Sequence, residues 1–266
     1  MEQFEKLPSL VDELVTSFVP AAAVGTTTFG ITQYSFWMYV AVIILAVLMV
    51  VFVRKQKATL VPQGRFVNAM EMCVDFVKND MLKATVGATW RKHFPFIATV
   101  FFFVLINNLL GVIPGMRPGT GAIGTTAAIA CCSFVYFIAV GIKKWGGWTY
   151  IKSLAPKGVA FPMNILVWVI EVFSTFLRLI TLAVRLFCNM LAGHIVMGTF
   201  CILISIFVEP LLQSFSVTAL TGAATSIIWL LILLIIYAVE ILVAAIQAYV
   251  FALLSAVYVQ LAEAGE

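Results

Sequence analysis

The sequence is poor in charged residues and in histidine. Its 266 residues include 16 basic and 12 acidic side chains but only 2 histidines, so 11% are charged, against about 25% in an ordinary soluble domain. No glycine-rich phosphate-binding loop is present, which argues against nucleotide chemistry on this chain. The five cysteines lack paired metal-ligand spacing, and the adjacent Cys131 and Cys132 are too close for ordinary disulfide geometry. We interpret all five as packing residues.

Apolar residues dominate the chain instead. They make up 63% of it, and the mean hydropathy is +1.09. A water-soluble core cannot absorb this much apolar sequence, so the chain is predicted to be an integral membrane protein with one polytopic domain over 1–266. The first residues are acidic and do not resemble a signal peptide. We expect a short interfacial helix there.

Five apolar stretches are long enough to cross a bilayer, and they predict an all-α membrane protein. The predicted spans are 33–53, 94–114, 121–142, 160–208 and 222–262. As single helices, the last two would be about 73 Å and about 60 Å long, against ~30 Å for a bilayer core. Each is therefore either one steeply tilted helix or two shorter spans.

The phase of the polar residues favours continuous helices. At about 100° per residue, six polar side chains of the fourth span fall within an arc of roughly 80°. They are Glu171, Ser174, Arg178, Thr181, Arg185 and Asn189. A broken helix need not keep its polar residues in phase over so many turns. We therefore expect five crossings, with the last two forming a long, steeply tilted hairpin.

The distribution of basic residues predicts the orientation. Eight of the 16 lie in the segment 54–92 and four in the segment 143–157. Because loops rich in lysine and arginine stay in the cytoplasm, we expect both segments and the C-terminus there, and the N-terminus outside. His93, beside two basic residues at a membrane edge, is predicted to be an interface residue.

Arg185 places a permanent charge inside this apolar region. A charge at mid-bilayer costs ~3 kcal/mol or more, so such residues usually face a bundle interior or a water-filled path. The guanidinium cannot lose its proton and would repel other protons. A carboxyl group stays protonated in lipid but ionises beside a positive charge, so Arg185 would act as a switch for it. A structural role is the alternative, in which Arg185 either extends toward the membrane interface or pairs with Glu171.

Seven further polar side chains can hold water or carry protons. They are Glu171, Ser174 and Thr181 on one side of Arg185, and Asn189, His194, Glu240 and Gln247 on the other. This set predicts two hydrated half-paths separated by the arginine. His194 lies about 180° round the helix from Arg185, and its pairing with Glu240 is a hypothesis based on depth.

Two motifs resemble subunit a of the F-type rotary ATP synthases. RLFCNMLAGH contains the arginine–leucine pair and the asparagine four residues after the arginine, and AIQAYVFALLSAVY contains the glutamine of the last helix. NNLLGVIPG is similar to the stretch before a turn in that family, and the resemblance covers about residues 94–262. It implies a stator subunit with two offset proton half-channels, which couples proton flow to rotation and ATP synthesis.

The resemblance also implies roles for the polar residues. Arg185 would be the essential arginine facing the ring of c subunits, with Gln247 close to it. The outer half-channel would be lined by Asn189, His194, Glu240 and Gln247, and the cytoplasmic one by Glu171, Ser174 and Thr181. In many relatives the position of His194 is a carboxylate and that of Glu240 a histidine, so the pair is exchanged here.

The implied partners are the c ring, subunit b of the peripheral stalk, the remaining ATP synthase subunits and membrane lipid. No cofactor, metal or nucleic acid is expected, and the chain alone is not expected to be an enzyme. The lack of a transit peptide favours a multi-pass protein of the bacterial plasma membrane. Two alternatives stay open: a self-contained secondary transporter or channel, which would show inverted repeats and broken helices, and a structural scaffold.

Overall fold

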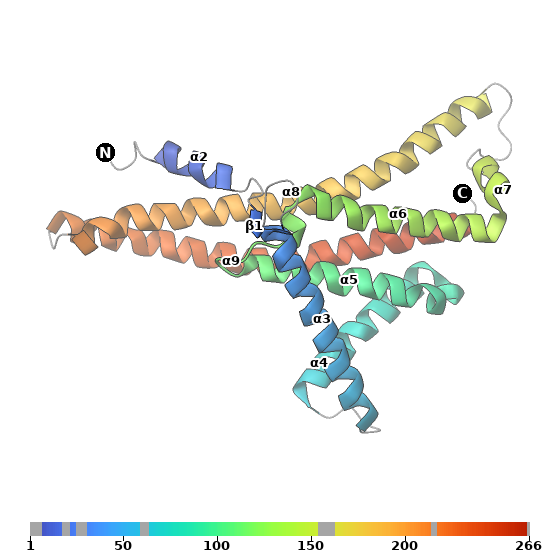
Figure 1. Ribbon diagram of the computed structural model, residues 1–266, viewed down its shortest axis with the longest axis horizontal. Helices are drawn as coiled ribbons and strands as arrows, with labels where there is room; N and C mark the ends of the chain where they lie inside the picture. Colours follow the sequence, from blue (N-terminus) through green and yellow to red (C-terminus); the bar gives the residue numbers. More distant parts are fainter. Residues whose placement is uncertain are drawn as a thin grey trace.

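The computed structural model describes residues 7–17, 22–24, 31–58, 64–153, 163–213 and 217–264, and almost all of them are helical (Figure 1). The elements in chain order are α2 (Leu7–Ser17), β1 (Ala22–Val24), β2 (Ile31–Thr32), α3 (Gln33–Ala58), α4 (Arg65–Asp75), the π-helix η1 (Phe76–Lys83), the 3₁₀ turn η2 (Gly87–Thr89), α5 (Trp90–Val112), the 3₁₀ turn η3 (Gly119–Gly121), α6 (Ile123–Trp145), α7 (Gly147–Ser153), α8 (Met163–Gln213) and α9 (Val217–Ala264). The two short strands pair antiparallel. The predicted all-α class is confirmed.

Five helices are long and apolar enough to cross a membrane: α3, α5, α6, α8 and α9. Their number agrees with the prediction, and each overlaps one of the five predicted spans. The helices α8 and α9 are continuous over 51 and 48 residues, which confirms the continuous alternative. α2 supplies the short helix expected near the N-terminus, and it packs against α8.

The predicted connection between the last two helices is too long. The predicted spans 160–208 and 222–262 leave residues 208–222 as their connection. Instead, α8 continues to Gln213 and α9 begins at Val217, and the three residues between them lie outside the described part. The two long helices contact each other.

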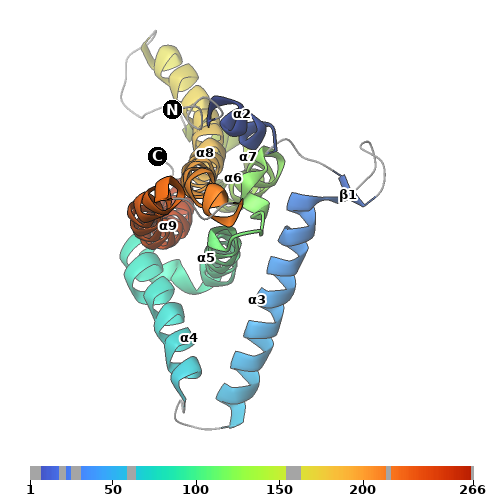
Figure 2. The ribbon, with the colours of Figure 1, turned by 90° about the vertical axis from the view of Figure 1, so that its left-hand side faces the viewer.

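The two long helices define the long axis of the molecule. They lie side by side in Figure 1 and are seen nearly end-on in Figure 2, whereas α3 crosses them at a steep angle in both views. α5 and α6 run beside α9, and α6 contacts both long helices. The first part of α8 diverges from α9 in Figure 1. The predicted hairpin is therefore present, with its two arms in contact over the later part of α8.

Small residues let the helices approach closely in the core. Ala244, Ala248, Ala252 and Ala256 recur every four residues on α9, and all are fully buried. Such a stripe permits close approach of membrane helices. It packs against α5 and the middle of α8, where Leu186 is also fully buried.

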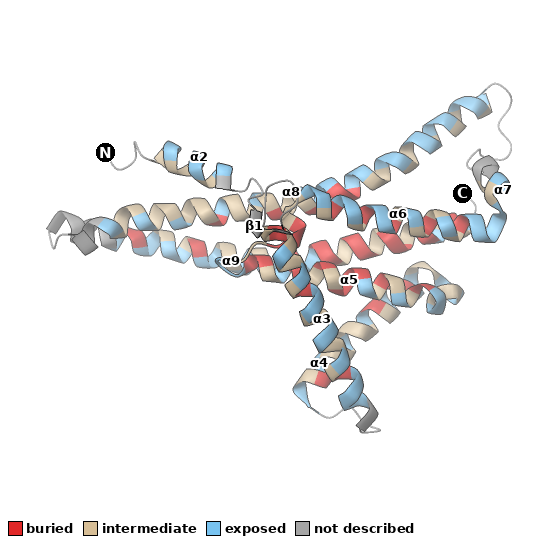
Figure 3. Ribbon diagram, in the orientation of Figure 1, coloured by how far each residue is buried: buried red, intermediate tan, exposed pale blue. Residues whose placement is uncertain are grey.

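Much of the surface of the long helices is exposed (Figure 3), and many of the exposed residues are large and apolar. An apolar surface of this extent is typical of contact with lipid or a protein partner. The cysteine interpretation is wrong in part, because Cys131, Cys132, Cys188 and Cys201 are exposed in this chain. Their thiols lie on helix faces that the chain itself does not cover.

Candidate functional site

Arg185 lies on the exposed side of α8. Val184 and Cys188 share that side, whereas Leu182 and Leu186 face the core. Among the residues that the structure describes, Arg185 has no hydrogen bond or ion pair. Its charge is therefore available to a group from outside the chain.

Arg178 occupies the same helix two turns earlier, but in a different setting. Its Nη2 lies 2.9 Å from Oε1 of Glu171, and its guanidinium carbon lies 5.6 Å from the ring centroid of Tyr258. Glu171 therefore has a basic partner, and that partner is not Arg185. The ion pair of Arg185 with Glu171, one form of the structural alternative, is therefore not formed.

The contacts between α8 and α9 fix which residues share a level in the hairpin. The Glu240 carboxylate lies against Gly193, where an added Cβ would collide with it, and Met190 packs with Ala244. Because the two helices are antiparallel, Gln247 lies at about the level of Leu186, the residue after Arg185. The sequence prediction that Gln247 lies near Arg185 agrees with this register in depth.

His194 and Glu240 also share a level, and both are half-buried. The close contact of the Glu240 carboxylate is with Gly193, the residue before His194. This shared level agrees with the hypothesis based on depth, and the pairing of His194 with Glu240 stays a prediction. His194 also lies within electrostatic range of Arg117, in the turn that follows α5.

Two amide groups near this level have donors without an acceptor among the described residues. They are Nδ2 of Asn189 and Nε2 of Gln247, both buried. An unmet buried donor costs about 1–3 kcal/mol, and bound water often supplies the acceptor in such places. Both amides can therefore donate to water or to a group brought in by a partner.

The hydroxyl residues on the other side of Arg185 differ from each other. Ser174 is half-buried beside the Glu171–Arg178 pair, whereas Thr181 is exposed. The Thr181 hydroxyl donates to the carbonyl of Arg178 at 3.1 Å, which leaves its oxygen free to accept. This back-bond is common for threonine in helices. Both residues lie on α8 between Glu171 and Arg185 in sequence.

Sequence reasoning missed the buried polar contacts that position α9. Asn108 donates to the carbonyl of Ala244 at 3.4 Å and accepts from the Thr120 hydroxyl at 3.0 Å. The hydroxyl groups of Ser133 and Ser255 lie 2.8 Å apart between α6 and α9. An asparagine pair inside an apolar span was the available signal, but spacing alone does not identify its partners.

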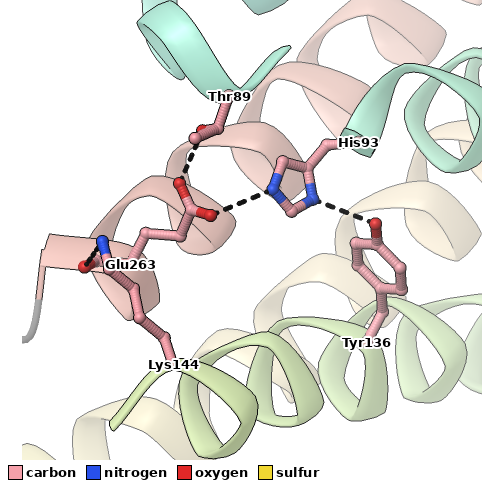
Figure 4. Close-up of polar contacts among 5 residues, drawn as sticks. All are labelled: Thr89, His93, Tyr136, Lys144 and Glu263. Carbon is pink, nitrogen blue, oxygen red and sulfur yellow. Dashed lines mark hydrogen bonds and ion pairs between the residues drawn. The ribbon is translucent and has the colours of Figure 1, made fainter. Parts of the chain in front are cut away.

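A second polar cluster joins the ends of α5, α6 and α9 (Figure 4). The His93 ring is 3% exposed, and its nitrogens lie 3.0 Å from the Tyr136 hydroxyl and 3.2 Å from Glu263. Thr89 donates to the other carboxylate oxygen of Glu263 at 2.7 Å. Protein therefore surrounds the His93 ring, and its position at the membrane interface stays a prediction.

The fold and this distribution of charge define a multi-pass membrane protein with a long helical hairpin. An arginine without an ionic partner in the described chain lies on the exposed side of that hairpin. The family model described as ATP synthase A chain matches residues 35–260. ATP synthase subunit a 2 of Prosthecochloris aestuarii is 35% identical over 93% of this chain and 73% of its own length. ATP synthase subunit a of Myxococcus xanthus is 33% identical over 97% and 77%, and that of Rhodopseudomonas palustris 35% over 92% of each chain.

The chain belongs to the ATP synthase subunit a family. It is thus a proton-translocating membrane stator subunit, a multi-pass protein of bacterial type that is not itself catalytic. Translocation belongs to the rotary complex as a whole. The resemblance drawn from RLFCNMLAGH and the last helix is confirmed.

Proposed function

We propose that Arg185 is the fixed charge that separates two proton half-channels and meets the carboxylates of a rotating c ring. The observation that carries this proposal is the exposed guanidinium without an ionic partner in the described chain, on the face of α8 that the core does not cover. A charge in this position is costly unless a partner group or water reaches it. The carboxylate of a c subunit is such a group.

The arginine controls the protonation of that carboxylate. A ring carboxyl in contact with lipid is neutral, because desolvation disfavours the anion. Beside Arg185 it releases its proton, since a nearby opposite charge stabilises the ionised form. Arg185 keeps its own charge throughout, so no proton passes directly between the two half-channels.

The outer half-channel is formed by the residues on the hairpin-tip side of Arg185. His194 and Glu240 lie at one level, and the amides of Asn189 and Gln247 have donors available to water nearer the arginine. Protons from outside would be accepted at His194 or Glu240 and passed along water toward the ring. The exchange of histidine and carboxylate positions keeps one imidazole and one carboxylate on this route.

The cytoplasmic half-channel is formed by Glu171, Ser174 and Thr181. The Glu171–Arg178 pair is partly exposed, with 31% and 25% of the two side chains accessible, so the chain itself leaves room for water beside it. The exposed Thr181 lies between this pair and Arg185 on α8. A proton released at the ring would leave along this side, and the membrane potential contributes ~2.3 kcal/mol per charge per 100 mV.

The large exposed apolar faces of α8 and α9 are the surfaces proposed to contact the c ring and lipid. Subunit b of the peripheral stalk would hold the chain against rotation, and the remaining subunits would carry the nucleotide sites. No cofactor or metal takes part in this proposal.

The decisive test uses the whole ATP synthase reconstituted in liposomes. Arg185→Ala should reduce ATP synthesis driven by an imposed proton gradient at least about 100-fold, because a preorganised charge is worth that much or more. Cys188→Ala, on the same exposed side of α8, should keep near-normal synthesis. Subunit composition on a native gel checks that both variants assemble.

Normal coupled synthesis in a fully assembled Arg185→Ala enzyme would overturn the proposal and favour a structural scaffold. The transporter alternative is tested by the isolated chain in liposomes. Sustained proton flux without c subunits would support that alternative, whereas the proposal predicts flux only in the complex.

A further inference from the structure

The ends of α5, α6 and α9 enclose a pocket that has no part in the proposed proton route. Its volume is about 770 Å³, and its lining includes Lys92 on α5 and Lys143 and Lys144 on α6. All three lysines are exposed. Their segments carry the basic residues that predict the cytoplasmic side, so the pocket lies at that surface of the membrane.

The polar residues that line the pocket do not neutralise most of the charge of the three lysines. Glu263 is the acidic residue among its lining, and its carboxylate already accepts hydrogen bonds from Thr89 and His93 (Figure 4). Lys144 donates to the backbone carbonyl of Glu263 at 2.7 Å, not to the carboxylate. Lys92 and Lys143 have no ion pair in the described part of the chain.

The remaining wall is apolar. Ala139 and Val140 line it on α6, in the last turns of a membrane-spanning helix. Trp145 follows on the same helix, with Lys144 Nζ 5.8 Å from its ring centroid. Lysine and tryptophan together mark the depth of lipid headgroups, so the pocket opens where a phosphate group and the start of an acyl chain meet.

We propose that this pocket binds the phosphate group of an anionic membrane lipid. The lysine ammonium groups would hold the phosphate, and Ala139 and Val140 would contact the apolar part of the same molecule. Basic pockets between membrane helices bind anionic headgroups in this way. Free phosphate has the same charge chemistry but would leave the apolar wall unused, which favours the lipid.

Native mass spectrometry of the full chain in detergent tests the proposal. Titration with dioleoyl-phosphatidylglycerol should produce a mass peak for the chain with one bound lipid. The zwitterionic dioleoyl-phosphatidylcholine should not produce this peak at the same concentration. Lys92→Gln combined with Lys143→Gln should weaken this binding about 30-fold, because the loss of each lysine charge weakens it about fivefold. The matched control is Arg54→Gln with Lys55→Gln, which removes two charges on α3 away from the pocket and should leave the affinity unchanged.

Equal phosphatidylglycerol affinity in the wild type and the pocket variant would overturn the proposal, as would an equal loss in both double variants. Inorganic phosphate at millimolar concentration should not displace the lipid, and displacement would overturn the assignment to a lipid. Matching melting temperatures of the three proteins would show that a loss of binding is not a loss of folding.

Discussion

Arg178 and Glu171 form an ion pair of 2.9 Å on α8, whereas Arg185, two turns further along the same helix, has no such partner in the described chain. Two arginines on one helix stripe therefore have different surroundings. Arg178 is neutralised within the chain and stacked near Tyr258. Arg185 remains available to a partner carboxylate, which the proposed mechanism requires.

This difference predicts unequal effects of removing each charge. Arg178→Gln should lower proton-driven ATP synthesis only about two- to fivefold, because a partly exposed ion pair contributes ~1 kcal/mol or less. Arg185→Gln should lower it at least about 100-fold. Synthesis rates in reconstituted enzyme, normalised to the amount of assembled complex, give the comparison. Equal losses in the two variants would contradict the distinction.

The contact between Gly193 and Glu240 gives a second prediction. Gly193→Ala should displace the Glu240 carboxylate, since an added Cβ has no room there. Proton flux through the complex should fall about 10- to 100-fold, as expected when a reacting group moves by about 1 Å. The measurement is fluorescence quenching by ATP-driven proton pumping in vesicles.

Gly124→Ala is the matched control for this variant, because an added Cβ at Gly124 meets no atom within 4 Å. It should pump normally. Glu240→Asp in the Gly193→Ala background shortens the acid by one carbon and should restore part of the flux. Normal pumping by Gly193→Ala alone would show that the position of Glu240 is not critical.

The five spans could be predicted from the sequence because length and hydropathy are local properties. The continuity of α8 and α9 followed from the phase of their polar residues, which is also local. The connection at the tip of the hairpin was predicted too long, because Pro210 and the nearby serines and threonines signal a turn by composition. Contact between two long helices is a tertiary effect that no single segment reveals.

The site could be predicted in outline but not in its pairings. Helical phase placed Glu171, Arg178 and Arg185 on one stripe, yet phase allows either arginine to pair with the acid. The burial of His93 depends on Tyr136 and Glu263, which lie 43 and 170 residues away in the sequence. Contacts between such distant residues require the packing of three helices, which spacing in one sequence does not give.

The Thr120–Asn108 bond predicts a loss of stability. Thr120→Val keeps the shape of the side chain but removes the donor to a fully buried amide oxygen. The variant should be about 1–3 kcal/mol less stable, the cost of an unmet buried polar group. Thermal unfolding in detergent should show a lower midpoint. Thr149→Val, at an exposed position on α7, should leave the midpoint unchanged, and equal midpoints in both would contradict the role of the bond.

The final prediction concerns the attachment of α9 at its C-terminal end. Glu263 accepts hydrogen bonds from Thr89 and from His93, and 17% of its side chain is accessible. Glu263→Ala removes both acceptors, so the last turns of α9 should open more often and exchange their amide hydrogens about tenfold faster or more.

Hydrogen-exchange mass spectrometry of peptides covering 257–264 measures this opening. Glu263→Gln retains a carbonyl oxygen that can accept from one donor, so its exchange should lie between those of the wild type and Glu263→Ala. Gln260→Ala is the control, since Gln260 is exposed on the same helix. Identical exchange in Glu263→Ala and Gln260→Ala would mean that the packing of Val259 and Ala262 holds this end of α9 without help from Glu263.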